Sequence, residues 1–379
     1  MPTPIVPLAA TPLPNDEVHF RVEVDQRDCT PTNAAIRAAL SDLQANGITL
    51  KISSIVTHAA HHFINSTIDP FGVGEMRVRA SLCWLILSAW NPRAEIPRGG
   101  PPYRLVLDNP KLARLKGLVT ELLGTGVGLL VAKRVYGIRL SLWKSTGMGQ
   151  VDFMAPNLSP GALKLEVRGR FDRVGWPAAH QGIRDKLRSW RDYRHAMGVL
   201  FAPRSTPNSR ATDILVCDPE GPGSNPDKYF GYRFLLQHYL RVFSIQGFRE
   251  VANSLMGLIR GGDQTWDAYL KGGVNVRRGG LSKRVSFRIG QRRFNGTIFD
   301  GAHWPAHLFG KTEIPKAGVF FWGLDSQIHD SIISGSLDKI SELAFEDECS
   351  TQGPYIRSVL SDGMAMVWAP TVQEIIEHP

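Results

Sequence analysis

The alternation of apolar and charged residues is clearest between residues 151 and 170, where it predicts two strands joined by a connector. In the second strand, leucine and valine alternate with charged residues, so a period of two places Lys164, Glu166 and Arg168 on one face. The connector is rich in Asn, Ser, Pro and Gly, which favour turns. The first strand carries Asp152, so the pattern predicts two carboxylates beside basic side chains. Two converging carboxylates are suited to a divalent metal ion.

Helical and strand periods elsewhere predict an α/β chain. Helices are expected over residues 32–45, 109–136, 178–195, 229–259 and 334–345, and strands over residues 19–24, 138–144, 196–202, 211–217, 297–299 and 318–323. The helix over 109–136 contains Gly124, Gly126 and Gly128, each of which weakens a helix by about 1 kcal/mol relative to Ala. Either this helix breaks at the glycines, or another segment packs closely against them.

Two stretches rich in proline and glycine, residues 92–102 and 219–227, divide the chain. They separate a mostly helical N-terminal region over 1–105, a central region over 106–220, and a C-terminal α+β region over 221–379. The length of 379 residues agrees with two or three domains at roughly 150 residues each.

The charge balance favours an anionic partner. Lys and Arg number 44 against 35 Asp and Glu, which gives a formal net charge of +9, and such a surplus suits nucleic acid. The four cysteines are scattered without a CxxC pair, which argues against a cysteine zinc site and against a disulfide scaffold. No apolar run is long enough to span a bilayer, and the first residues lack a basic signal region. We therefore expect a cytoplasmic protein with no membrane partner.

The order of elements in the central region resembles the PD-(D/E)XK nuclease superfamily. A helix with Glu121 precedes a strand with Asp152, a strand with Glu166-Val167-Arg168, a basic helix and two further strands. The resemblance covers residues 106–220. It implies a mixed-sheet, restriction-endonuclease-like core flanked by helices, and a metal-dependent hydrolysis of DNA or RNA phosphodiester bonds, with restriction or phage defence as a suitable role.

The resemblance also implies roles for individual residues. Asp152, Glu166, the carbonyl of Val167 and Glu121 would hold Mg²⁺ or Mn²⁺, and Gln181 would orient water or phosphate. Two positions differ from the usual pattern, since Val151 stands where Pro is usual and Arg168 where Lys is usual. An arginine can hold a phosphate through two parallel hydrogen bonds, but it is too basic to take a proton from water. Lys164, on the same strand face, is a candidate to supply the missing ammonium.

Two basic segments are candidates for contacting nucleic acid, for which DNA is expected ahead of RNA. One is the helix over 178–195 and the other is the segment over 271–293, where Phe287 lies among the cations. Cations bind phosphates and aromatic rings stack on unpaired bases. The residues expected to bind are Arg184, Lys186, Arg188, Arg191, Arg277, Arg278, Lys283, Arg284, Arg288, Arg292 and Arg293.

Other interpretations of the same residues remain open. Asp152 and Glu166 could be ordinary cross-strand ion pairs with Lys164 and Arg168, each stabilising by about 1 kcal/mol at most. The chain could also be a nuclease-like fold without catalysis, serving as a nucleic-acid-binding or assembly subunit, and either a homodimer or a partner protein is compatible with it. The histidines in THAAHH, residues 57–62, have helical spacing, but no acid or cysteine completes a zinc site there.

Overall fold

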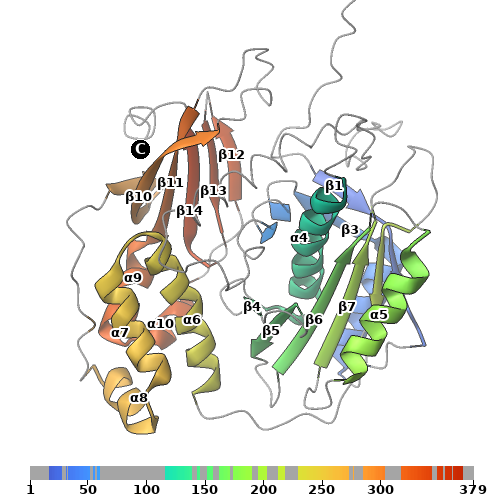
Figure 1. Ribbon diagram of the computed structural model, residues 1–379, viewed down its shortest axis with the longest axis horizontal. Coiled ribbons are helices and arrows are strands. Elements are labelled where there is room, and N and C mark those ends of the chain that lie inside the picture. Colours follow the sequence, from blue (N-terminus) through green and yellow to red (C-terminus); the bar gives the residue numbers. More distant parts are fainter. Residues whose placement is uncertain are drawn as a thin grey trace, which may run out of the picture.

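The part of the chain that the computed structural model describes is mixed α/β and contains three sheets (Figure 1). It describes residues 17–27, 31, 33–51, 54–55, 58–59, 116–138, 143–145, 152–156, 162–170, 174–189, 195–202, 212–217, 229–272, 276, 285–303, 317–343, 348–352, 355–360 and 362–369. Within these residues, no helix is both long and apolar enough to cross a membrane.

The central sheet has six strands in the order β2-β8-β7-β6-β5-β4. The strands are β2 (Val22–Val24), β4 (Lys144–Ser145), β5 (Phe153–Pro156), β6 (Ala162–Gly169), β7 (His195–Phe201) and β8 (Ile214–Cys217). The sheet is mixed, because β6 is parallel to β7 and β2 is parallel to β8, whereas the other neighbours are antiparallel. This agrees with the expectation of a mixed sheet with flanking helices.

Two helices, α4 (Lys116–Tyr136) and α5 (Trp176–Ser189), cover opposite faces of this sheet, and Figure 1 shows them on either side of β6 and β7. The Leu163, Leu165 and Val167 side chains of β6 belong to the large core that includes α4. On the other face, α5 packs on a small core formed with Ala196, Leu200 and Cys217. The charged face of β6 therefore looks toward α5.

The glycines of α4 do not break the helix, because other segments pack closely against them. A Cβ added at Gly124 would lie 2.8 Å from Cα of Gly169, and one at Gly126 would lie 2.1 Å from the Ile55 carbonyl oxygen. At Gly128, the added atom would meet the Val167 side chain at 2.7 Å. Of the two readings of the glycines, close packing is therefore correct.

The N-terminal residues join two different sheets. Residues 19–24 were expected to form one strand, but β1 (Glu17–Phe20) pairs with β3 (Ile48–Lys51), while β2 is the edge strand of the central sheet. The switch occurs at Arg21, whose N–H donates to Asp213 Oδ2 at 2.8 Å. In the chain, α1 (Ala34–Asn46) lies between β2 and β3, where a helix was expected over residues 32–45, and it is capped by Asn33 and ends at Gly47 with φ of 68°.

The C-terminal region contains a six-stranded antiparallel sheet in the order β12-β13-β14-β11-β10-β9. Its strands are β9 (Val285–Ile289), β10 (Arg292–His303), β11 (Ala317–Asp325), β12 (Glu348–Gln352), β13 (Tyr355–Val359) and β14 (Met364–Ala369). Its helices are α6 (Phe230–Ile245), α7 (Arg249–Arg260), α8 (Asp263–Leu270), α9 (Ser326–Ser334) and α10 (Leu337–Glu342). Helix α6 also contacts β4 and β5, so the two larger sheets are linked through it.

Several elements of the C-terminal region differ in detail from the expectations. The helical region expected over 229–259 consists of two helices, and Gly247 takes φ of 78° between α6 and α7. The short strand expected over 297–299 is the long strand β10, and β12 to β14 and α9 were not expected at all. Four successive residues of β14, Met364 to Val367, are all buried, so this part of the strand lacks the alternation that identifies a half-buried strand.

Candidate functional site

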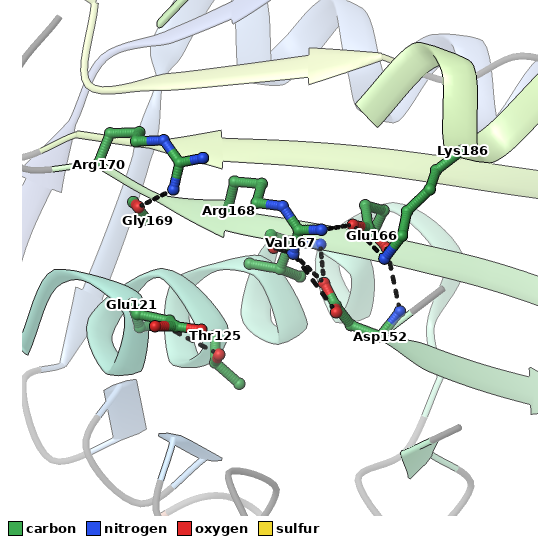
Figure 2. Close-up of polar contacts among 9 residues, drawn as sticks. All are labelled: Glu121, Thr125, Asp152, Glu166, Val167, Arg168, Gly169, Arg170 and Lys186. Atoms are coloured by element: carbon green, nitrogen blue, oxygen red, sulfur yellow. Dashed lines mark hydrogen bonds and ion pairs between the residues drawn. The ribbon is translucent and has the colours of Figure 1, made fainter. Parts of the chain in front are cut away.

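The two carboxylates predicted on the hairpin lie side by side (Figure 2). Asp152 immediately precedes β5, and the pairing of Phe153 with Leu165 brings it next to Glu166 and Val167 on β6. The Asp152 N–H donates to Glu166 Oε2 at 3.1 Å, and the Val167 N–H donates to Asp152 Oδ2 at 2.8 Å. The main chain of the two strands thus fixes both carboxylates in place.

The guanidinium of Arg168 lies among the oxygens of both carboxylates. Its Nη1 donates to Asp152 Oδ2 at 3.2 Å, to Asp152 Oδ1 at 3.5 Å, and to the Val167 carbonyl at 3.1 Å. Its Nη2 forms an ion pair with Glu166 Oε1. These oxygens belong to three of the groups that the resemblance would assign to a metal ion.

A second cation reaches the pair from α5. Lys186 Nζ donates to both Glu166 oxygens, at 2.9 and 3.1 Å. The sequence placed Lys186 among residues contacting nucleic acid, and its contact with Glu166 was missed. The sequence contained an indication of this contact. Lys186 lies three residues after Ile183 and next to Leu187, and both of these belong to the buried face of α5.

Glu166 is the most deeply buried member of this cluster, since its side chain is 0 % exposed whereas those of Asp152, Arg168 and Lys186 are 29, 30 and 27 % exposed. Burial and the neighbouring Asp152 carboxylate raise the pKa of Glu166 to about 7, although Arg168 and Lys186 oppose that rise. The loss of hydration at Glu166 is thus the main cause of the raised pKa, and the neighbouring Asp152 carboxylate adds to it.

This pKa predicts how stability depends on pH. Because the folded-state pKa of Glu166 is above its usual 4.5, the folded chain holds this proton more tightly than the unfolded chain, and stability falls as pH rises from 4.5 through about 7. Between about pH 5.5 and about pH 8.5, we expect Glu166 to lower the free energy of unfolding by about 2 kcal/mol. Urea denaturation at both pH values checks this, and Glu166→Gln should remove that part of the change. Parallel curves for the two proteins would contradict it.

Three other predicted site residues lie in different surroundings. Lys164 is 3 % exposed and shares the Glu166 face of β6. Glu121 is exposed on α4, which covers the opposite face, and Figure 2 joins it only to Thr125, whose hydroxyl donates to its carbonyl at 3.1 Å. Gln181 is exposed on α5 and donates to Asp185 at 2.7 Å. The structure therefore brings neither Glu121 nor Gln181 to the carboxylate pair.

The predicted nucleic-acid contacts are only partly described. Arg184 lines a cavity of about 580 Å³ with Asp25 and His180, and Arg188 lies within α5. Arg191, Arg277, Arg278, Lys283 and Arg284 lie outside the described residues. In the histidine segment, His58 is buried and hydrogen-bonded to the Ser54 carbonyl at 2.8 Å, whereas His61 and His62 lie outside the described residues.

The remaining cations lie on the β9–β10 hairpin. Arg288 and Arg293 are directly opposite each other across the two strands, and both are exposed. Arg293 donates to the Ser286 hydroxyl at 3.1 Å, and Arg292 lies 3.9 Å from Asp325. Like charges directly opposite on a sheet repel each other, so Arg288 and Arg293 form a surface that an anion would stabilise.

The donor set can be compared with what a divalent cation requires. Asp152, Glu166 and the Val167 carbonyl supply hard oxygen ligands, which Mg²⁺ and Mn²⁺ prefer. No cluster of three or more His, Cys, Asp or Glu side chains suited to a metal ion occurs in the described part of the chain. The two carboxylates and the Val167 carbonyl supply too few ligands to fill the coordination shell of a hard cation. They therefore fit one such cation that completes its coordination with water or phosphate oxygens.

Comparisons with known proteins find no matching protein-family model, no similar curated protein and no similar solved structure.

Proposed function

We propose that this protein is a divalent-metal-dependent nuclease built on a restriction-endonuclease-like core, with DNA as the first candidate substrate. The observation that carries the proposal is the cluster on the β5–β6 hairpin. There, Asp152 and buried Glu166 are held together by main-chain hydrogen bonds, with two cations against them. A surface ion pair would need neither the burial of Glu166 nor a second cation from another element.

In this proposal, Asp152, Glu166 and the Val167 carbonyl hold Mg²⁺ or Mn²⁺. When bound, the metal supplies Lewis-acid activation of a phosphodiester and neutralises charge that develops on it. Glu121 is not part of the proposed ligand set, because α4 lies across the sheet from Glu166.

The two cations have different parts in the proposal. Arg168 is 30 % exposed, so its guanidinium can bind a phosphate at the mouth of the site through paired hydrogen bonds. Lys186 supplies an ammonium against Glu166 from a helix, whereas the usual position two residues after Glu166 holds Arg168. Because it donates to both Glu166 oxygens, Lys186 also fixes the orientation of that carboxylate.

The β9–β10 hairpin supports an anionic polymer as the substrate. Arg288 and Arg293 place two positive charges directly across from each other on one exposed face of this hairpin, and the net charge of the whole chain is +9. Backbone phosphates are the anions that such a surface would bind, in a salt-dependent and sequence-independent manner.

A second candidate function is supported by the position of Arg168. The guanidinium of Arg168 already contacts both carboxylates and the Val167 carbonyl, so it can neutralise the site without a metal ion. In that case the chain would be a nuclease-like fold without catalysis that serves as a nucleic-acid-binding or assembly subunit. The two candidates differ in whether the site accepts a metal ion.

A cleavage assay tests the proposed function. The full chain is incubated with supercoiled plasmid, linear duplex, single-stranded DNA and RNA, each with Mg²⁺, Mn²⁺ or EDTA. We expect cleavage that requires metal and stops with EDTA, and the substrate that is cut identifies the class. Binding of all four substrates without cleavage in either metal would favour the second candidate.

A further inference from the structure

Arg168 and a metal ion would need the same atoms. The guanidinium contacts Asp152 Oδ2 at 3.2 Å, the Val167 carbonyl at 3.1 Å, and Glu166 Oε1 through an ion pair. A cation bound by these oxygens would lie in the space that the guanidinium fills. The two positive groups would also repel each other strongly in a site where Glu166 is fully buried.

The side chain of Arg168 has a route out of the cluster. It is 30 % exposed, and it belongs to a strand whose main chain is fixed by pairing with β7, so the side chain can turn outward without moving the sheet. Lys186 still neutralises Glu166 after such a turn, because it reaches both oxygens from α5. Asp152 keeps its hydrogen bond from the Val167 N–H.

We propose that Arg168 is a resident cation that a metal ion must displace, and that the displaced guanidinium then binds the phosphate of the substrate. This inference rests on the proposed function and adds a coupling to it. Metal binding is weakened because Arg168 has to give up its contacts with the two carboxylates. A nucleic-acid phosphate that binds the displaced guanidinium compensates for these lost contacts and so raises the affinity of the site for the metal. Metal and nucleic acid therefore bind with positive cooperativity, and each raises the affinity for the other by the same factor.

The test measures binding of Mn²⁺ by calorimetry to the full chain, without and with a short phosphorothioate oligonucleotide that resists cleavage. Arg168→Met removes the competing charge at similar length, and we expect it to bind Mn²⁺ at least tenfold more tightly than the wild type. The oligonucleotide should tighten Mn²⁺ binding to the wild type by a larger factor than to Arg168→Met, in which only direct contact between phosphate and metal couples the two ligands. Arg170→Met is the matched control, because Arg170 is exposed and bonded to the Gly169 carbonyl, and its Mn²⁺ affinity should stay within twofold of the wild type.

Each outcome bears on the inference. Equal Mn²⁺ affinity of the wild type and Arg168→Met would overturn it and leave the metal site intact. Absence of Mn²⁺ binding in every protein would overturn the proposed function as well. If Arg168→Met fails to fold, Arg168→Lys serves in its place. The compact ammonium of lysine cannot contact both carboxylates and the Val167 carbonyl at once, so this variant should bind Mn²⁺ with intermediate affinity. The wild-type titrations with and without oligonucleotide test the cooperativity without any variant.

Discussion

Glu166→Gln is expected to lower metal-dependent cleavage by at least about 10³-fold, which corresponds to about 4 kcal/mol of transition-state stabilisation. Gln keeps the size and shape of Glu166 and can still accept the hydrogen bond from the Asp152 N–H. It removes the buried negative charge that would attract the metal, and it weakens the contacts with Lys186 and Arg168. The measurement is the initial rate of cleavage of the substrate identified for the wild type.

Nucleic-acid affinity measured without metal should change little in this variant, because Glu166 is fully buried and the exposed cations are unaltered. Asp185→Asn is the matched control, since Asp185 is an exposed acid on α5 that bonds only Gln181 among the hydrogen bonds described for it. We expect its cleavage rate to stay within twofold of the wild type. Cleavage by Glu166→Gln at the wild-type rate would show that this carboxylate has no part in catalysis.

Gly169→Ala should destabilise the folded protein by about 3 kcal/mol or more. An added Cβ would lie 1.8 Å from the Thr120 carbonyl oxygen and 2.8 Å from Glu121 Cα, so α4 would have to shift away from the end of β6. Both obstacles are main-chain atoms in a helix, which cannot move aside singly. Thermal unfolding would then occur about 4 °C lower, because an unfolding entropy of about 2.1 cal/mol/K per residue gives about 0.8 kcal/mol/K for 379 residues.

Gly182→Ala provides the contrast. Gly182 is exposed on α5 and nothing lies within 4 Å of its added Cβ, so the substitution should stabilise the helix by up to about 1 kcal/mol. The two variants make the same chemical change on opposite faces of the sheet. Equal melting temperatures for both would refute the close packing of α4 on β6.

The features that the sequence predicted well depend on local patterns. The strand over 162–169 alternates strictly, and α1 carries a helical stripe of Ile36, Leu40 and Leu43 that ends at Gly47. The pair Asp152 and Glu166 could be predicted because a hairpin brings residues together that are near each other in the chain. The metal, the substrate and the catalytic roles stay predictions.

The features that it missed depend on distant partners. Which face of the sheet α4 covers decides that Glu121 lies apart from Glu166, and no local pattern carries that information. The contact of Lys186 with Glu166 depends on how α5 packs on the sheet. A basic helical pattern alone indicates only a solvent-exposed helix surface. Close approach of Gly169 to α4 likewise became clear only from the packed helix.

The pairing of β2 with β8 has a consequence for how the protein is made. Val22 lies opposite Ile214, and between them the chain forms the other strands of the same sheet. During synthesis, the segment that becomes β2 leaves the ribosome long before its partner exists, so it has to remain unpaired while the hairpin with Asp152 and Glu166 forms. Because contacts of such long sequence separation form slowly, we expect closure of this sheet edge to be a late step in folding.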